Sequence, residues 1–152
     1  MTKPELAAEY MKSGYNCAQS IVKAFAADAG ITNEDELIKM AAPFGGGIGR
    51  NGFVCGALTG AALIIGKMYG NKEPSDLEGR EKAYEAVNKL LDEFKMKHKS
   101  LLCKDLISID MRNEKELTKA KEEGVFQTQC PVFLMTAGIL LEKTLNGRKN
   151  FE

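Results

Sequence analysis

The chain has 152 residues, of which 44% are apolar, and its 21 basic and 21 acidic side chains give a formal net charge of zero. This length is typical of one domain with one hydrophobic core. Because positive and negative charges are mixed along the sequence, no charged block predicts binding to nucleic acid or to an anionic membrane surface. We expect residues 1–152 to form a single domain that binds neither.

The apolar runs predict no membrane span and no export signal. The longest run, residues 53–66, is too short and too rich in glycine to cross a bilayer, which takes about 20 residues. The N-terminal sequence "MTKPELAAEYMK" carries charges where a secretory signal is apolar. We therefore expect a cytoplasmic protein, and in a reducing compartment cysteines serve metal binding, redox chemistry or packing rather than a disulfide framework.

Helical periodicity begins at the N-terminus. Pro4–Lys12 predicts a surface helix, and a second helix is expected to start at Cys17 with Asn16 as its N-cap. Its apolar face contains Cys17, Ile21, Ala24 and Phe25. The segment "EDELIKMAA" predicts a third helix, capped by Thr32 or Asn33, that ends before Pro43.

Helices are also predicted in the remainder of the chain. One begins at Cys55, and the longest spans Asp76–Lys99 with Ser75 as its N-cap. Cys103 is expected near the start of a short helix with Ser100 as its cap. Asn113–Glu123 predicts another short helix, and a further helix begins at Cys130. No segment alternates apolar and polar residues as a strand does. We predict an all-α single-domain bundle of about six or seven helices, with a glycine-rich loop before a central helix.

The glycine-rich loop lies in "PFGGGIGRNGFVCGALTG", residues 43–60, which contains seven glycines. Part of it has the spacing of a dinucleotide-binding fingerprint, but a helix precedes it where that fingerprint requires a strand. The later "GAALIIGKM" has five residues between its glycines where a phosphate-binding loop has four. Two interpretations remain: a loop that points N–H groups at a ligand just before Cys55, or a tight crossover between helices.

The four cysteines, Cys17, Cys55, Cys103 and Cys130, are separated by 38, 48 and 27 positions and form no CxxC pair. Zinc ribbons and thioredoxin motifs contain such local pairs, so these cysteines can meet only through tertiary folding. Three of them begin predicted helices, where the helix dipole favours a thiolate. Converging thiolates suit zinc, an iron–sulfur cluster or dithiol–disulfide cycling, whereas buried cysteines can also serve only as packing residues.

The order "GYNCAQS", then "FGGGIGRNGFVCGALTG", then single Cys103 and Cys130, resembles the redox-active family named for a C…GCAxxG…C…C pattern. That family is all-helical and of about this length, although the local order in this chain is Cys55-Gly56-Ala57. The resemblance implies redox activity that rests on the four cysteines. A related helical domain in split-Soret cytochromes is associated with an iron–sulfur centre, and since this chain has no CxxCH, the haem part of that comparison does not apply.

Two classes of function therefore remain open. The first is a redox protein that uses the four cysteines for electron transfer or thiol–disulfide chemistry, with or without an iron–sulfur cluster. The second is a non-enzymatic zinc-binding or helical interaction module. We expect the cysteines to be the catalytic or metal-binding residues and Gly46, Gly47, Gly49 and Arg50 to be cofactor-binding residues. The glycine-lined apolar helices indicate a homodimer, whereas the sequence identifies no redox partner.

Overall fold

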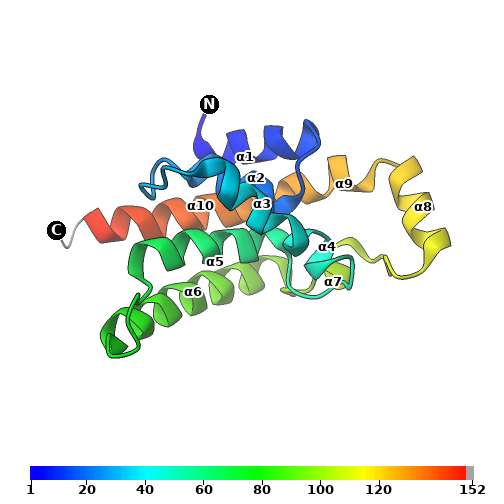
Figure 1. Ribbon diagram of the computed structural model, residues 1–152. Coiled ribbons are helices and arrows are strands. Elements are labelled where there is room, and N and C mark those ends of the chain that lie inside the picture. Colours follow the sequence, from blue (N-terminus) through cyan, green and yellow to red (C-terminus); the bar gives the residue numbers. More distant parts are fainter. Residues whose placement is uncertain (150–152) are drawn as a thin grey trace.

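A computed structural model describes residues 1–149, with side chains through residue 147, and in this part of the chain the regular secondary structure consists of helices and one isolated β-bridge. The elements, in chain order, are α1 (Lys3–Lys12), α2 (Cys17–Phe25), α3 (Glu34–Ala41), the 3₁₀ turn η1 (Ala42–Phe44), α4 (Gly45–Ile48), α5 (Gly56–Tyr69), α6 (Leu77–His98), α7 (Cys103–Ile107), α8 (Glu114–Glu122), α9 (Val125–Thr128) and α10 (Cys130–Lys149). The predicted all-α bundle is confirmed (Figure 1). The short elements η1, α4 and α9 lie outside the predicted helices.

The long C-terminal helix α10 crosses the middle of the bundle, between α1 on one side and α5 and α6 on the other (Figure 1). Its inner face carries Leu134, Ala137 and Leu141, which are fully buried. By length and composition alone, the segment Val125–Gly147 could cross a membrane. The burial of these three residues against neighbouring helices places one face of α10 in the core.

Helices α2 and α5 approach each other closely because two positions on α5 have no side chain. A Cβ atom on Gly60 would lie 2.8 Å from the carbonyl oxygen of Ala18 and 3.0 Å from the Cβ of Ile21. A Cβ on Gly56 would lie 3.0 Å from the amide nitrogen of Ala18. Real Cβ atoms do not pack at such distances without displacing their neighbours, so these glycines fix the separation of the two helices.

Two of the predicted helix caps are wrong, and one of them is at α7, where Leu102 rather than Ser100 is the N-cap. Asn16 caps α2, as predicted, and accepts a hydrogen bond from the amide of Gln19 at 3.0 Å. The predicted cap of α6 is wrong: Asp76, not Ser75, is the N-cap, and its carboxylate accepts a bond from the amide of Gly79 at 3.0 Å. The backbone carbonyl of Ser75 accepts from Leu77 in a tight turn, which places Ser75 outside the helix.

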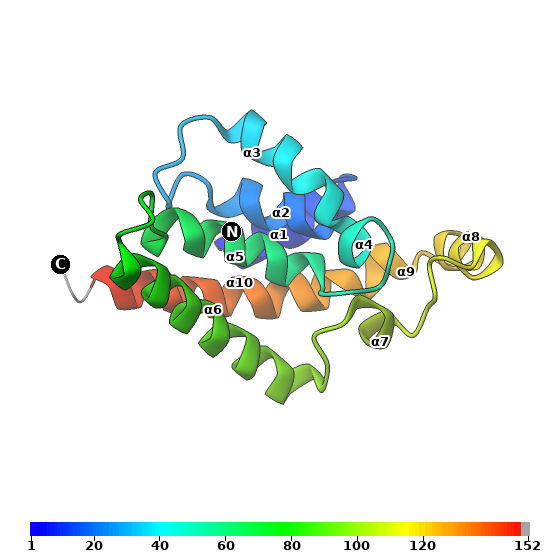
Figure 2. The ribbon, with the colours of Figure 1, turned by 60° about the horizontal axis from the view of Figure 1, so that its bottom comes forward.

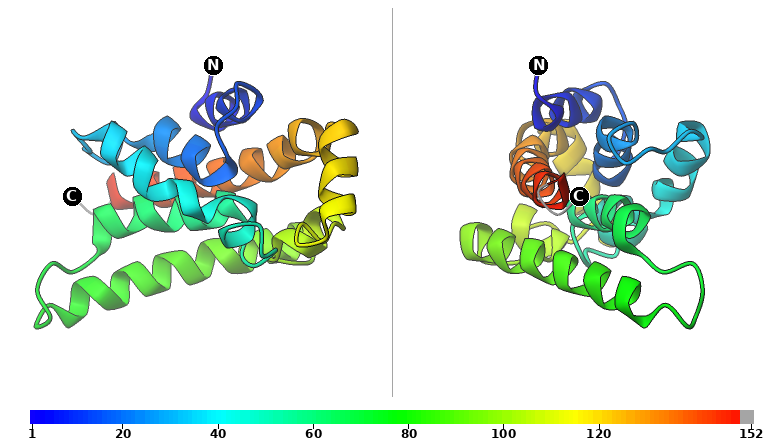
Figure 3. Two further views of the ribbon diagram at one scale, coloured as in Figure 1. Left: turned by 45° about the vertical axis from the view of Figure 1, so that its right-hand side comes forward. Right: turned by 90° about the vertical axis from the view of Figure 1, so that its left-hand side faces the viewer.

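The short elements gather at one end of the bundle. Figures 1 and 2 both place α4, α7 and α9 at the end where α10 begins. Both views of Figure 3 show α6, in light green, along the lower edge of the molecule. Because α2, α5, α7 and α10 each begin at a cysteine or directly after one, this arrangement brings helix N-termini and sulfur atoms into the same region.

We predict opposite effects on stability for two glycine substitutions within α5. Gly60→Ala inserts a methyl group into the α2–α5 contact and should lower the free energy of unfolding by about 1–3 kcal/mol. Gly66→Ala, on the exposed face of the same helix with no atom within 4 Å of the new Cβ, should raise it by about 1 kcal/mol. Urea unfolding measures both. Equal effects of the two substitutions would contradict the packing described.

Candidate functional site

Residues 46–50 form one turn of left-handed helix. All five have φ values between 61° and 70°, although Ile48 and Arg50 carry side chains. A left-handed conformation costs a residue with a Cβ atom about 1–2 kcal/mol. The glycines therefore keep the conformational free-energy cost of this turn low, and contacts with surrounding residues must stabilise Ile48 and Arg50 in it.

The amide groups of this loop are largely used within it. Four of them donate to backbone carbonyls at 2.9–3.2 Å: Gly49 to Pro43, Asn51 to Ile48, Gly52 to Gly46, and Phe53 to Gly47. The prediction that the loop presents free amides to a ligand is wrong for these four groups, because the left-handed turn satisfies them internally.

The segment after the turn pairs with the chain that precedes α7. The amide of Cys55 donates to the carbonyl of Leu101 at 2.9 Å, and the amide of Cys103 donates to the carbonyl of Phe53 at 2.6 Å. These bonds flank the β-bridge between Val54 and Leu102. The short ladder holds Cys55 at the start of α5 close to Cys103 at the start of α7.

Two glycines allow the backbone to approach the cysteines. A Cβ on Gly47 would lie 2.8 Å from the Cβ of Cys103, so the left-handed turn packs directly on that residue. A Cβ on Gly56 would lie 3.0 Å from the Cβ of Cys17, so the start of α5 packs on the start of α2. The glycine-rich sequence therefore brings together segments that carry three of the cysteines.

A cavity of about 440 Å³ opens at this end of the bundle, and Cys17, Cys103 and Cys130 line it. Among the residues expected to bind a cofactor, Gly46, Gly49 and Arg50 also line the cavity. Cys55 is 3% exposed and Gly47 is buried. Six of the expected site residues therefore line the cavity, whereas Cys55 and Gly47 are buried and do not line it.

Sequence reasoning did not identify several residues of the cavity wall. Met11 and Met111 contribute thioethers, and the Sγ of Cys17 lies 3.9 Å from the Sδ of Met11. Lys121 and Phe126, on α8 and α9, complete another part of the wall. These residues are distant from the cysteines in sequence and follow ordinary helical patterns, so no local motif marked them.

Cys17 and Cys130 form the most strongly interacting pair in the site. Interaction with the neighbouring Cys17 thiol lowers the pKa of Cys130 despite its burial. The same interaction, followed by burial, raises the pKa of Cys17 well above its ordinary value. When this pair loses one proton, the negative charge therefore resides on Cys130, and Cys17 remains protonated.

The other two cysteines are protonated at neutral pH. Burial raises the pKa of Cys55 to about 12, although the amides of Ala57 and Leu58 act in the opposite direction. Burial also raises the pKa of Cys103 to about 12. The predicted thiolates are therefore absent at Cys17, Cys55 and Cys103, where loss of hydration outweighs the helix dipole, and at Cys130 it is the Cys17 thiol that lowers the pKa.

All four sulfur atoms lie within electrostatic reach of one another. Negative charge on Cys130, Cys55 or Cys103 raises the pKa of Cys17. Within residues 1–147, however, no three His, Cys, Asp or Glu side chains are arranged to hold one metal ion.

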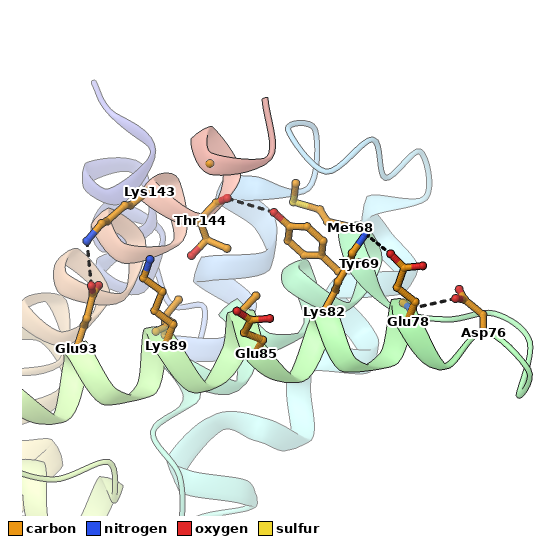
Figure 4. Close-up of a pocket in the computed structure, with 14 residues that line it drawn as sticks. Met68, Tyr69, Asp76, Glu78, Lys82, Glu85, Lys89, Glu93, Lys143 and Thr144 are labelled. Atoms are coloured by element: carbon orange, nitrogen blue, oxygen red, sulfur yellow. Dashed lines mark hydrogen bonds and ion pairs between the residues drawn. The ribbon is translucent and has the colours of Figure 1, made fainter. Parts of the chain in front are cut away.

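His98 and a second cavity lie outside the cysteine site. His98 pairs with the hydroxyl of Thr136 at 2.8 Å and contacts the ring of Phe94, and burial lowers its pKa. A larger cavity of about 780 Å³ lies along α6, and none of its described lining residues is a cysteine (Figure 4). Its charges include the ion pairs Lys82–Glu78 at 3.0 Å and Lys143–Glu93 at 2.9 Å.

Comparison with known proteins gives one match. Residues 15–144 match the family described as "Putative redox-active protein (C_GCAxxG_C_C)". No curated protein and no solved structure matches the chain. The matched range contains all four cysteines and the entire glycine-rich loop.

We predict that Gly47 is more sensitive to substitution than Gly49. Both have positive φ, so alanine at either position should cost about 1–2 kcal/mol of folding free energy. Gly47→Ala also meets Cys103 and should cost about 1–3 kcal/mol more, whereas at Gly49 the nearest atom lies 3.8 Å away. Urea unfolding measures the difference, and equal losses would show that the turn does not pack on Cys103.

We further predict that iodoacetamide modifies Cys130 at lower pH than the other cysteines, as mass spectrometry of the labelled peptides will show. Cys17→Ala removes the neighbouring thiol and should raise the pH midpoint of Cys130 labelling by about one unit. Cys103→Ala is the matched control and should leave this midpoint unchanged. A midpoint that does not move in Cys17→Ala would show that Cys17 does not lower the pKa of Cys130.

Proposed function

Because the chain belongs to the C_GCAxxG_C_C family, we propose that it is a redox protein whose primary reactive group is the thiol pair Cys17 and Cys130. The observation that carries this proposal is that both thiols line the same open cavity, where the neighbouring Cys17 thiol lowers the pKa of Cys130. A thiolate with a second thiol beside it is the arrangement that thiol–disulfide exchange requires.

The proposed reaction reduces a substrate disulfide by two electrons. The Cys130 thiolate attacks one sulfur of the substrate, so that a mixed disulfide forms and the other substrate half leaves as a thiolate. Cys17 then loses its proton to that leaving group or to water and attacks the Cys130 sulfur. The second substrate half leaves, and the protein retains a Cys17–Cys130 disulfide. An external dithiol returns the protein to its reduced form.

Cys55 and Cys103 have a supporting role in this proposal. With a pKa of about 12, each remains a thiol at neutral pH and reacts slowly as a nucleophile. Their backbone ladder fixes the wall against which Cys17 and Cys130 lie. They are also available as a second pair once the first pair has been oxidised.

An iron–sulfur cluster is the second candidate, and the electrostatic contact of Cys17 with the other three sulfurs favours it. Thiolates are the ligands of such clusters, and Cys17, Cys55, Cys103 and Cys130 are the residues that would hold one. When bound, the cluster would supply one-electron transfer. The zinc-binding module is the remaining alternative and uses the same four residues.

One set of measurements separates these candidates. The protein is purified without oxygen from a reducing cytoplasm, its visible absorption and its iron and zinc contents are measured, and it is then oxidised with diamide. We expect colourless, metal-free protein in which peptide mapping finds a Cys17–Cys130 disulfide. Cys17→Ser should abolish this disulfide, and Cys103→Ser, the matched control, should retain it.

The other possible results of these measurements would each contradict the assignment of a Cys17–Cys130 dithiol. Stoichiometric iron with visible absorption that is lost in Cys55→Ser would replace the dithiol with a cluster. Stoichiometric zinc with no disulfide after oxidation would indicate the non-enzymatic module. A disulfide between a different pair of cysteines would overturn the assignment of Cys17 and Cys130.

A further inference from the structure

We infer that the cysteine-lined cavity takes a small disulfide that carries negative charge, such as one bearing carboxylates. This inference rests on the proposed dithiol function and names its class of substrate. The shape of the cavity, the charge of its wall and the placement of Arg50 each support it.

The accessibility of Cys130 determines the size of the substrate. Cys130 is 5% exposed and lines a cavity of about 440 Å³. This volume lies in the range of small-molecule sites, which is about 300–1,000 Å³. A disulfide must enter the cavity to reach the nucleophile, and a small molecule meets that requirement better than a disulfide fixed in a folded protein.

The charged residues in the described wall of the cavity are all basic. Among the described residues that line the cavity, Arg50 and Lys121 are basic and none is acidic. The whole chain carries equal numbers of acidic and basic residues, so this local excess is not a consequence of overall composition. Both side chains belong to exposed residues, and within residues 1–147 neither forms an ion pair. Two unpaired cations at a cavity attract an anionic ligand.

The backbone holds Arg50 at this position. Arg50 ends the left-handed turn with a φ of 70°, a conformation that its side chain disfavours. A Cβ on Gly46 would lie 2.9 Å from the Cγ of Arg50, so the side-chain stem packs over Gly46, and both residues line the cavity. The strained turn therefore keeps Arg50 at the cavity wall, and the planar shape of its guanidinium suits a carboxylate.

Three disulfide reagents of different charge test the inference. They are 5,5′-dithiobis(2-nitrobenzoate), which is dianionic, 4,4′-dithiodipyridine, which is neutral, and cystamine, which is dicationic. Rate constants with the fully reduced protein are divided by those of 2-mercaptoethanol with the same reagent, which corrects for intrinsic reactivity. We expect the normalised rate at low ionic strength to be about tenfold or more higher for the dianion than for the dication, and this ratio to fall as salt is added.

Substitutions assign this preference to the two cations. Arg50→Gln and Lys121→Gln should each lower the ratio of dianion to dication rates by about threefold or more, because each removes one positive charge near the cavity. Lys115→Gln removes an equivalent charge from α8 outside the cavity and should leave the ratio unchanged. A ratio near one, or one that Arg50→Gln and Lys121→Gln do not change, would overturn the inference.

Failure of the proposed function gives a different result. If the neutral reagent produces no Cys17–Cys130 disulfide, the dithiol reaction itself is wrong and the inference fails with it. If all three reagents produce that disulfide at similar normalised rates, the dithiol reaction stands and only the anionic substrate class is rejected.

Discussion

The close approach of α2 and α5 is the constraint from which the arrangement of the thiols follows. With no side chain at Gly56 and Gly60, the start of α5 lies against the backbone of Ala18 and the Cβ of Cys17. The chain before α5 then pairs with the segment that leads into α7, which adds Cys103. Helix α10 contacts both α2 and α5 and supplies Cys130. One short contact between helices thus organises four distant parts of the sequence.

The chemistry of the site comes from competition between burial and hydrogen bonding. Helix N-termini surround the cysteines, but burial raises the pKa of Cys55 and Cys103 to about 12. Only at Cys130 does interaction with a neighbouring thiol, that of Cys17, outweigh the loss of hydration and lower the pKa. In the proposed reaction, this asymmetry makes Cys130 the nucleophile and Cys17 its partner.

The sequence predicts the helices well because their capping and periodicity are local. Asn16 and Asn33 cap the expected helices, and the order of the cysteines along these helices is apparent from the sequence. The left-handed turn was not predicted, since it includes Ile48 and Arg50 at positive φ, which only the tertiary environment stabilises. The protonation states were also missed, because burial depends on packing between distant segments. Met11 and Lys121 reach the cavity for the same reason.

A reductive titration of the oxidised protein tests the central claim, that Cys17 and Cys130 act as one two-electron pair. The account predicts a first reduction step that consumes two electrons per chain, leaves visible absorption unchanged and disappears in Cys130→Ser. A first step of one electron per chain, accompanied by bleaching of visible absorption, would contradict it.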